Sequence, residues 1–261
     1  MENLQQWQIN LSKNEQEILN GSSCLVLQKV METVVRYGEA LKAPRLAEIT
    51  GSGHLVIPWS IPGISPPLEM LEELVAAGLK TLFPFTLDPR PPLDFENLGL
   101  PGHLESAIRR MHKDQDRYDV LMQKLGLRDQ QAYSCYPYSR EVGNIPERGA
   151  VLAWSESACA IYANSVLAAR TNHNGAIIDL LQNIVGKTPY TGLITDQGRL
   201  ADCIVEIRSA SLPNPQLLGA AIGKQVQSGV PFLVGLDRYL SLEIDLRTAD
   251  FLQEFGAALA T

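Results

Sequence analysis

Apolar and polar residues follow two periods along the chain, one typical of helices and one of strands. Between Leu25 and Tyr37 the apolar residues recur three and four positions apart, which predicts an amphipathic helix. Val151–Trp154 is a short apolar run followed by Ser, Glu and Ser and then by an Ala-rich stretch, which predicts a buried strand that leads into a helix. Because such strands and helices alternate, the sequence indicates an α/β fold with largely parallel sheets flanked by helices.

The same signals place the other elements. Ser12 and Glu15 form a capping box, which starts a helix. Further helices are expected over 66–75, 104–125, 158–169, 177–185, 214–227 and 249–261, and further strands over 45–49, 55–57, 81–85, 203–207 and 231–236. No internal repeat divides the chain, and the loop over 126–149 is the candidate hinge between two subdomains.

The junction after Trp154 is the first candidate for chemistry. Ser155 or Ser157 can cap the predicted helix, and Glu156 in its first turn complements the positive end of the helix dipole. The carboxyl end of a strand is where open α/β sheets bind ligands. Ser157 and Asn164 share one face of the helix, and buried polar groups need hydrogen-bond partners from the protein or from a ligand. Both interpretations, a satisfied structural helix and a ligand site, stay open at this point.

Charge and composition exclude several classes of partner. The net charge is −7 and no run of Lys and Arg exceeds two residues, which argues against nucleic acid and anionic membranes. No apolar run approaches the roughly 18 residues of a membrane span. The first ten residues lack the regions of a signal peptide, so a cytoplasmic setting is expected.

The four cysteines form no CxxC pair, so the chain alone carries neither a zinc nor a ferredoxin pattern. In a reducing setting disulfides are not expected. His54 follows Gly51, Ser52 and Gly53, and a loop histidine has structural uses as well as catalytic ones.

Three stretches resemble the aconitase X family: CYPY at 135–138, AWSESACAIYANSVLAART at 153–171 and GKTPYTGL at 186–193. The resemblance also covers Leu11–Glu15 and the Gly53–His54 pair, and it extends to the end of the chain. It implies an aconitase-like fold and a hydro-lyase that removes water from a small hydroxylated acid, such as mevalonate 5-phosphate or cis-3-hydroxyproline. It also implies an iron–sulfur cluster held by three cysteines, whose open iron acts as a Lewis acid, and a general base.

The resemblance assigns roles to individual residues. It implies that Cys135 is a cluster ligand and that Glu156 and Ser157 are catalytic. The substrate-binding residues that it implies are His54, Ser155, Asn164, Ser165, Arg170 and Thr171. The guanidinium of Arg170 fits a carboxylate or a phosphate, although a basic residue near a helix C-terminus is also a common dipole partner. We expect Cys135, Glu156, Asn164 and Arg170 to converge in one pocket.

The remaining cysteines, Cys24, Cys159 and Cys203, match no ligand of the family and are expected to be small buried thiols. The chain also departs from the family pattern at Ser22, Asp88, His173 and Ile194. The family continues well past Thr261, and the further cluster ligands and a small swivelling domain belong to that part or to a separate subunit. One chain is therefore expected to hold no cluster by itself.

Three interpretations of function follow. The first is a partial catalytic module over 1–261, a hydro-lyase subunit or fragment that other polypeptides complete. The second is a non-catalytic paralogue that binds a small acid or serves in assembly. The third is a shortened form of a normal enzyme. Near the C-terminus, Phe251, Leu252, Phe255 and Leu259 form an apolar helical face that needs cover. We expect the chain to lack this cover, and so to form a homo-oligomer or bind a partner subunit that carries the missing domains.

Overall fold

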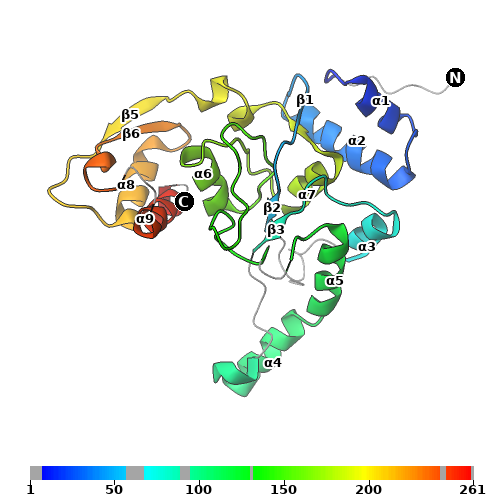
Figure 1. The fold of residues 1–261 in the computed structure, drawn as a ribbon, viewed down its shortest axis with the longest axis horizontal. Coiled ribbons are helices and arrows are strands. Elements are labelled where there is room, and N and C mark those ends of the chain that lie inside the picture. Colours follow the sequence, from blue (N-terminus) through cyan, green and yellow to red (C-terminus); the bar gives the residue numbers. More distant parts are fainter. Residues whose placement is uncertain (1–7, 57–67, 89–94, 130–131, 242–244, 260–261) are drawn as a thin grey trace.

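The computed structural model describes residues 8–56, 68–88, 95–129, 132–241 and 245–259 (Figure 1). The helices are α1 Lys13–Leu19, α2 Leu25–Ala40, α3 Leu68–Ala76, α4 Gly102–Met111, α5 Gln115–Leu125, α6 Ser157–Ser165, α7 Ala176–Val185, α8 Pro215–Val226 and α9 Leu246–Leu259. The strands are β1 Leu46–Glu48, β2 His54–Leu55, β3 Thr86–Leu87, β4 Lys187–Pro189, β5 Cys203–Glu206 and β6 Pro231–Val234. None of the helices in these ranges is long and apolar enough to cross a membrane.

The first two helices begin where the sequence predicts. The Ser12 hydroxyl accepts a hydrogen bond from the Glu15 N–H, and the Glu15 carboxylate accepts one from the Ser12 N–H, which completes the capping box of α1. Helix α2 buries Met31 and Val34 in the largest core and continues two residues past Gly38. That core also receives residues from α3, α5 and α7.

Short parallel pairings connect extended segments that are far apart in the sequence. β2 pairs with β3, and single-residue bridges join Leu87 to Tyr133, His54 to Trp154 and Val151 to Arg170, all of them parallel. β5 and β6 form a second parallel pair, whereas β1 and β4 are antiparallel. The fold is therefore α/β with largely parallel pairing, but its ladders are only two to four residues long.

Several predicted boundaries are wrong. The strand expected over 81–85 lies at 86–87, because Pro84 has no N–H for a ladder and the Thr81 hydroxyl bonds within a turn, to the Phe83 carbonyl. The helix expected over 104–125 is two helices, since the backbone leaves the helical conformation at His112. The helix expected over 158–169 ends at Ser165. Residues 57, 66 and 67 of the predicted elements lie outside the described residues, and the hinge over 126–149 stays a prediction.

The C-terminal helix has the cover that the sequence analysis expected it to lack. Helix α9 packs along α8 and against α6 (Figure 1), and Phe251 and Phe255 are buried in a core that also contains Ile222 of α8 and Ile207. The expectation of an uncovered face was wrong because the cover comes from within the chain, from a helix three turns long that precedes α9. Residues 260–261 of the predicted helix lie outside the described part.

Two glycines of α8 allow this close packing. A Cβ atom at Gly219 would lie 2.4 Å from the Phe255 carbonyl oxygen, and one at Gly223 would lie 2.2 Å from that of Leu259. Since each clash is with backbone, a side chain at either position must push the two helices apart. The glycines therefore fix the distance between α8 and α9.

We predict that Gly219→Ala lowers the free energy of unfolding by about 1–3 kcal/mol, the usual cost of overpacking a core. Urea unfolding measures the change. Gly102→Ala is the matched control, because a Cβ atom at Gly102, in the first turn of α4, meets no atom within 4 Å. The control should be neutral or slightly stabilising, since alanine is the better helix former. Equal stability of the two variants would contradict this description of the α8–α9 contact.

Candidate functional site

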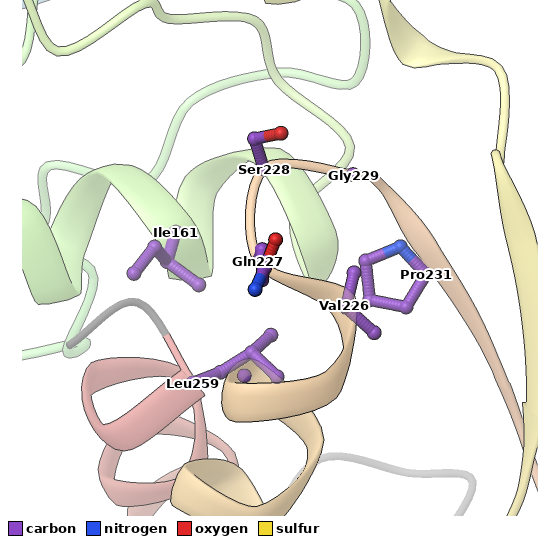
Figure 2. A pocket seen from close by; sticks show the side chains of 8 residues that line it. Ile161, Val226, Gln227, Ser228, Gly229, Pro231 and Leu259 are labelled. Atoms are coloured by element: carbon purple, nitrogen blue, oxygen red, sulfur yellow. The ribbon is translucent and has the colours of Figure 1, made fainter.

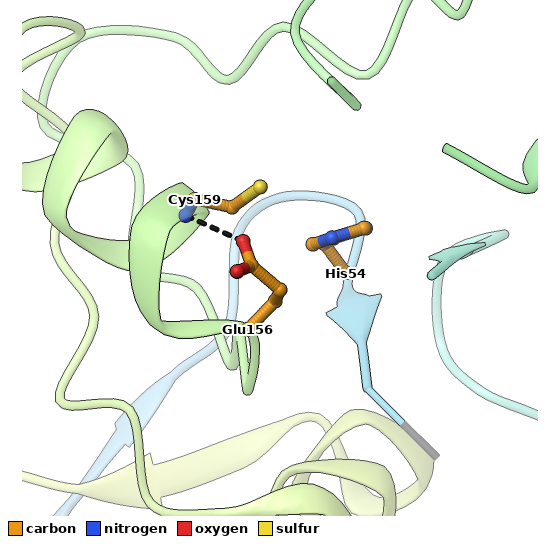
Figure 3. A group of neighbouring side chains, drawn as sticks. All are labelled: His54, Glu156 and Cys159. Atoms are coloured by element: carbon orange, nitrogen blue, oxygen red, sulfur yellow. Dashed lines mark hydrogen bonds between the residues drawn. The ribbon is translucent and has the colours of Figure 1, made fainter. Parts of the chain in front are cut away.

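Three extended segments end at one edge of the parallel arrangement: Asp88 follows β3, Glu156 comes two residues after Trp154, and Cys135 comes two residues after Tyr133. His54, which begins the short strand β2, pairs with Thr86 and Trp154 of two of these segments. Because the segments are parallel, their carboxyl ends meet on the same side, which is the usual ligand side of an α/β sheet. The N-terminus of α6 lies at this edge as well. Figure 3 shows the side chains of His54, Glu156 and Cys159 around one small space.

Glu156, and not Ser155 or Ser157 as predicted, caps α6. Its backbone is extended, and its carboxylate accepts hydrogen bonds from the N–H groups of Ala158, at 3.1 Å, and Cys159, at 2.6 Å. Ser155 is buried and accepts a bond from the Val56 N–H, which ties it to the segment after β2. Ser157 is exposed in the first turn of α6. The negative charge of Glu156 thus lies at the positive end of the helix dipole.

His54 is fully buried and held from several sides. Its Nδ1 lies 2.9 Å from the Thr86 hydroxyl, its Nε2 lies 3.4 Å from Asp88 Oδ1, and its ring meets the edge of Trp154. The Asn144 amide donates to the same Thr86 hydroxyl and to the Gly53 carbonyl. His54 therefore belongs to the structured edge of the sheet, and Asn144 is a supporting residue that no local pattern in the sequence marks.

The two thiols at this edge differ in exposure. Cys135 is exposed, whereas Cys159 is buried and its Sγ donates to the Cys135 carbonyl. Burial raises the pKa of both thiols, and the carboxylates of Asp88 and Glu156 raise these pKa values further. Both thiols are therefore protonated at neutral pH unless a cation binds nearby. Of the cysteines expected to be buried, Cys24 is exposed and Cys203 is partly exposed, so that expectation holds for Cys159 alone.

Cys159 is a residue of this site that was not predicted from the sequence. The signal was its spacing from Glu156: the N-cap residue and the third residue of a helix lie within hydrogen-bond reach of each other. That spacing brings the thiol to the carboxylate.

Asn164 and Thr171 are engaged within the chain. The Asn164 amide donates to the carbonyls of Ala160 and Thr171 and accepts from the Thr171 N–H and from Arg199. The Thr171 hydroxyl is buried and accepts from the Trp154 N–H. These bonds join α6 to the segment after it. The substrate-binding roles of both residues stay predictions.

Arg170 lies further from the edge. It bridges to Val151, which is five residues before Glu156, and at about 3.3 Å per residue the two positions are roughly 16 Å apart along the segment. Its guanidinium donates to the Ile194 carbonyl and to Asp196. Ser165 is exposed at the end of α6. The structure thus groups Cys135 with Glu156, and a joint pocket that includes Asn164 and Arg170 stays a prediction, as do the roles of Arg170 and Ser165.

A separate cavity of about 180 Å³ lies where α6 meets α8 and α9 (Figure 2). Its lining includes Ile161 of α6, Val226 of α8 and Leu259 of α9, and none of the residues that line it is titratable. It offers no group for acid–base or metal chemistry, so the edge near Glu156 is the better candidate for a reaction.

The cysteines of this chain do not make a complete cluster site. A cluster takes three or four ligands, usually thiolates. Two thiols meet at the edge, while Cys24 precedes α2 and Cys203 lies in β5, on opposite sides of the view in Figure 1. Cys135, being exposed, fits one ligand of a cluster whose other ligands come from outside these residues.

This fold, with its acidic and thiol-bearing edge, is of the aconitase-like α/β class. The chain belongs to the aconitase X family, because the family model described as "Aconitase X first domain" matches residues 8–197.

Similar proteins cover nearly the whole chain. The chain is 32% identical to the phosphomevalonate dehydratase large subunit of Thermococcus kodakarensis, over 95% of this chain and 58% of that protein. It is 28% identical to the cis-3-hydroxy-L-proline dehydratase of Hypocrea jecorina, over 97% of this chain and 40% of that protein. A crystal structure of aconitase X from Thermococcus kodakaraensis, in its holo-form, superposes with a TM-score of 0.73 at 31% identity, over 96% of this chain and 58% of that one. The chain thus spans less than two thirds of the length of these relatives.

Proposed function

We propose that this chain forms part of a hydro-lyase that dehydrates a small hydroxylated carboxylic acid, and that further polypeptide completes the enzyme. The observation that carries the proposal is the meeting of Glu156, His54 and Asp88 at one edge of the parallel segments, with the Cys135 thiol close to both carboxylates. The similar proteins that carry dehydratase names support the reaction class.

Dehydration needs a base for the proton and an acid for the leaving hydroxyl. We assign the proton transfer to Glu156, whose carboxylate is held in place by two N–H groups of α6. The hydroxyl of Ser157, exposed in the first turn of α6, can donate a hydrogen bond to the carboxylate of a substrate. His54 is a positioning residue, since its ring is fixed by Thr86 and faces Asp88. An iron–sulfur cluster, when one is bound in the complete enzyme, supplies a Lewis acid for the hydroxyl group.

The substrate and partners follow from the relatives. Their names include phosphomevalonate and cis-3-hydroxy-L-proline, so we propose a substrate of this size and charge. A large subunit implies a partner subunit, and we propose that such a partner, or a second copy of the chain, completes the site. A cytoplasmic location fits a metabolite of this kind.

One observation favours the alternative of a binder without catalysis. The resemblance assigns Asn164 and Arg170 to substrate binding, but the side chains of both residues form hydrogen bonds with other residues of the chain. A protein that kept the fold and lost the substrate contacts would show such internal bonding.

Proton exchange separates the two functions without requiring a complete turnover. We predict that the chain binds mevalonate 5-phosphate or cis-3-hydroxy-L-proline and, in D₂O, incorporates deuterium at the carbon next to the hydroxylated one, followed by NMR. Glu156→Gln keeps the size of the cap and should slow the exchange by at least about a hundredfold, the low end for general base catalysis, while binding persists. Glu147→Gln, on an exposed loop, is the control and should exchange normally. Binding without exchange supports the alternative, and exchange that is unchanged in Glu156→Gln overturns the assignment of the proton transfer to Glu156.

A further inference from the structure

Two buried polar atoms at the sheet edge make no hydrogen bond among the residues that the structure describes. They are His54 Nε2 and Asp88 Oδ1, which face each other at 3.4 Å, beyond the usual hydrogen-bond distance. The His54 side chain has no exposed surface, so bulk water does not contact its ring. A buried donor or acceptor without a partner costs free energy, and such a group in a native fold usually awaits a ligand, a water or an ion.

Other possible metal ligands lie close to the His54 ring. A ring nitrogen of His54, a carboxylate oxygen of Glu156 and the Sγ of Cys159 all lie within 4.8 Å of one another (Figure 3). For metal bonds of about 2.0–2.3 Å, ligand atoms on one tetrahedral ion lie roughly 3–4 Å apart, so small side-chain rotations would close the set around a single ion.

The surroundings hold these three side chains in place. The His54 ring is oriented by the contact of its Nδ1 with the Thr86 hydroxyl. The Glu156 carboxylate is oriented by the N–H groups of Ala158 and Cys159, and each of its oxygens keeps a lone pair for an ion. Metal-binding histidines and carboxylates are commonly fixed by such outer contacts.

We propose that His54, Glu156 and Cys159 bind one divalent transition-metal ion, Zn²⁺ by the chemistry of its ligands, at a mononuclear site distinct from an iron–sulfur cluster. One imidazole, one carboxylate and one thiolate are ligands that Zn²⁺ prefers. A cluster is a poor fit for this set, because it contains a single thiol. Three protein ligands leave a fourth position open, as in catalytic zinc sites.

The charges at the site favour a cation. Glu156 and Asp88 bring negative charge to this edge. Among the residues that the structure describes, His54 is the only basic side chain within ion-pair distance of either carboxylate. When the ion binds, the Cys159 S–H bond breaks, the sulfur forms a bond to the metal, and the proton leaves to solvent. The proposed ion shares His54 and Glu156 with the proposed dehydration, but its test measures ion binding and not turnover, so the two proposals can fail separately.

Cobalt provides the test. The chain is stripped of metal with a chelator and titrated anaerobically with Co²⁺, and then with Zn²⁺ as a competitor. We expect one Co²⁺ per chain, with a thiolate-to-cobalt charge-transfer band and the visible bands of tetrahedral cobalt, all of which Zn²⁺ abolishes. In Cys159→Ser the charge-transfer band should vanish. Zn²⁺ affinity should fall at least tenfold there and in His54→Gln, since loss of an outer contact alone costs about 10–100-fold.

The other thiols are the controls. Cys135→Ser and Cys24→Ser remove exposed thiols and should keep the band. The proposal is overturned if the wild-type chain shows no such band, or if the band survives Cys159→Ser and disappears in Cys135→Ser. Should Cys159→Ser fail to fold, X-ray absorption at the zinc edge of the wild-type protein decides, since the site requires one sulfur ligand among nitrogen and oxygen ligands.

Discussion

We expect the contribution of Asp179 to the stability of the fold to be lost as the pH rises from about 4 to about 7, because its carboxyl is buried. Asp179 has no exposed surface and accepts hydrogen bonds from the Asn174 side chain and from the N–H groups of Asn174 and Gly175. Burial raises the pKa of Asp179 from 3.8 to about 7, although these hydrogen bonds act to lower it. The folded protein therefore holds a proton that the unfolded chain has already released.

The direction of the effect follows from this difference in bound protons. Between the two pKa values the folded state binds more protons than the unfolded state, so the free energy of unfolding falls as the pH rises. Below the lower pKa both states are protonated and the stability is intact, and above about pH 7 both are ionised and the loss is complete. A shift of about three pKa units, at 1.36 kcal/mol each, corresponds to roughly 4 kcal/mol.

Two variants separate the effect of Asp179 on stability from that of the other carboxyl groups. Asp179→Asn cannot ionise, so its stability relative to the wild type should rise across the window by up to about 4 kcal/mol. Asp116→Asn makes the same substitution at an exposed position on α5 and is the matched control. Urea unfolding at a series of pH values measures both. Parallel curves for Asp179→Asn and the wild type would contradict a buried carboxyl with a raised pKa.

The local elements of this fold were predictable where short-range chemistry decides. The capping box of Ser12 and Glu15 and the run from Val151 to Trp154 carry their own signals, and the structure has the helix and the extended segment there. Pro84 carried a signal too, and the predicted strand should have begun after it.

Contacts between elements that are far apart in the sequence could not be predicted from the hydrophobic pattern. The approach of α9 to α8 depends on backbone contacts at Gly219 and Gly223, and no periodicity in α9 reveals which helix covers it. The edge site depends on bridges of single residues, such as that between His54 and Trp154, which leave no strand-length signal. The roles assigned to Asn164 and Arg170 rest on resemblance, and their hydrogen bonds depend on Arg199, Ile194 and Asp196, which the motif does not contain.

Replacing Trp154 should have the largest effect of any single change near the site. Its side chain has no exposed surface, its Nε1 donates to the Ser52 carbonyl at 2.8 Å, and its ring meets that of His54 at a centroid distance of 5.5 Å. We expect Trp154→Ala to lower the free energy of unfolding by about 3–5 kcal/mol, the usual cost of removing a large buried aromatic residue. The cavity would open beside His54, so the variant should also lose the ordered imidazole environment that NMR of the histidine ring reports.

Two further variants separate the volume of Trp154 from its hydrogen bond. Trp154→Phe keeps an aromatic ring against His54 but leaves the Ser52 carbonyl without its donor, so we expect a smaller loss, about 1–3 kcal/mol. Leu200→Ala truncates an apolar residue that is mostly exposed and should stay within about 0.5 kcal/mol of the wild type. Urea unfolding ranks the three variants. If Trp154→Ala cost no more than Leu200→Ala, the ring would not be packed between the parallel segments, and the position of His54 would need another explanation. We expect Trp154→Ala to be much less stable than Trp154→Phe, because the buried volume of the ring contributes more to the free energy of unfolding than its single hydrogen bond.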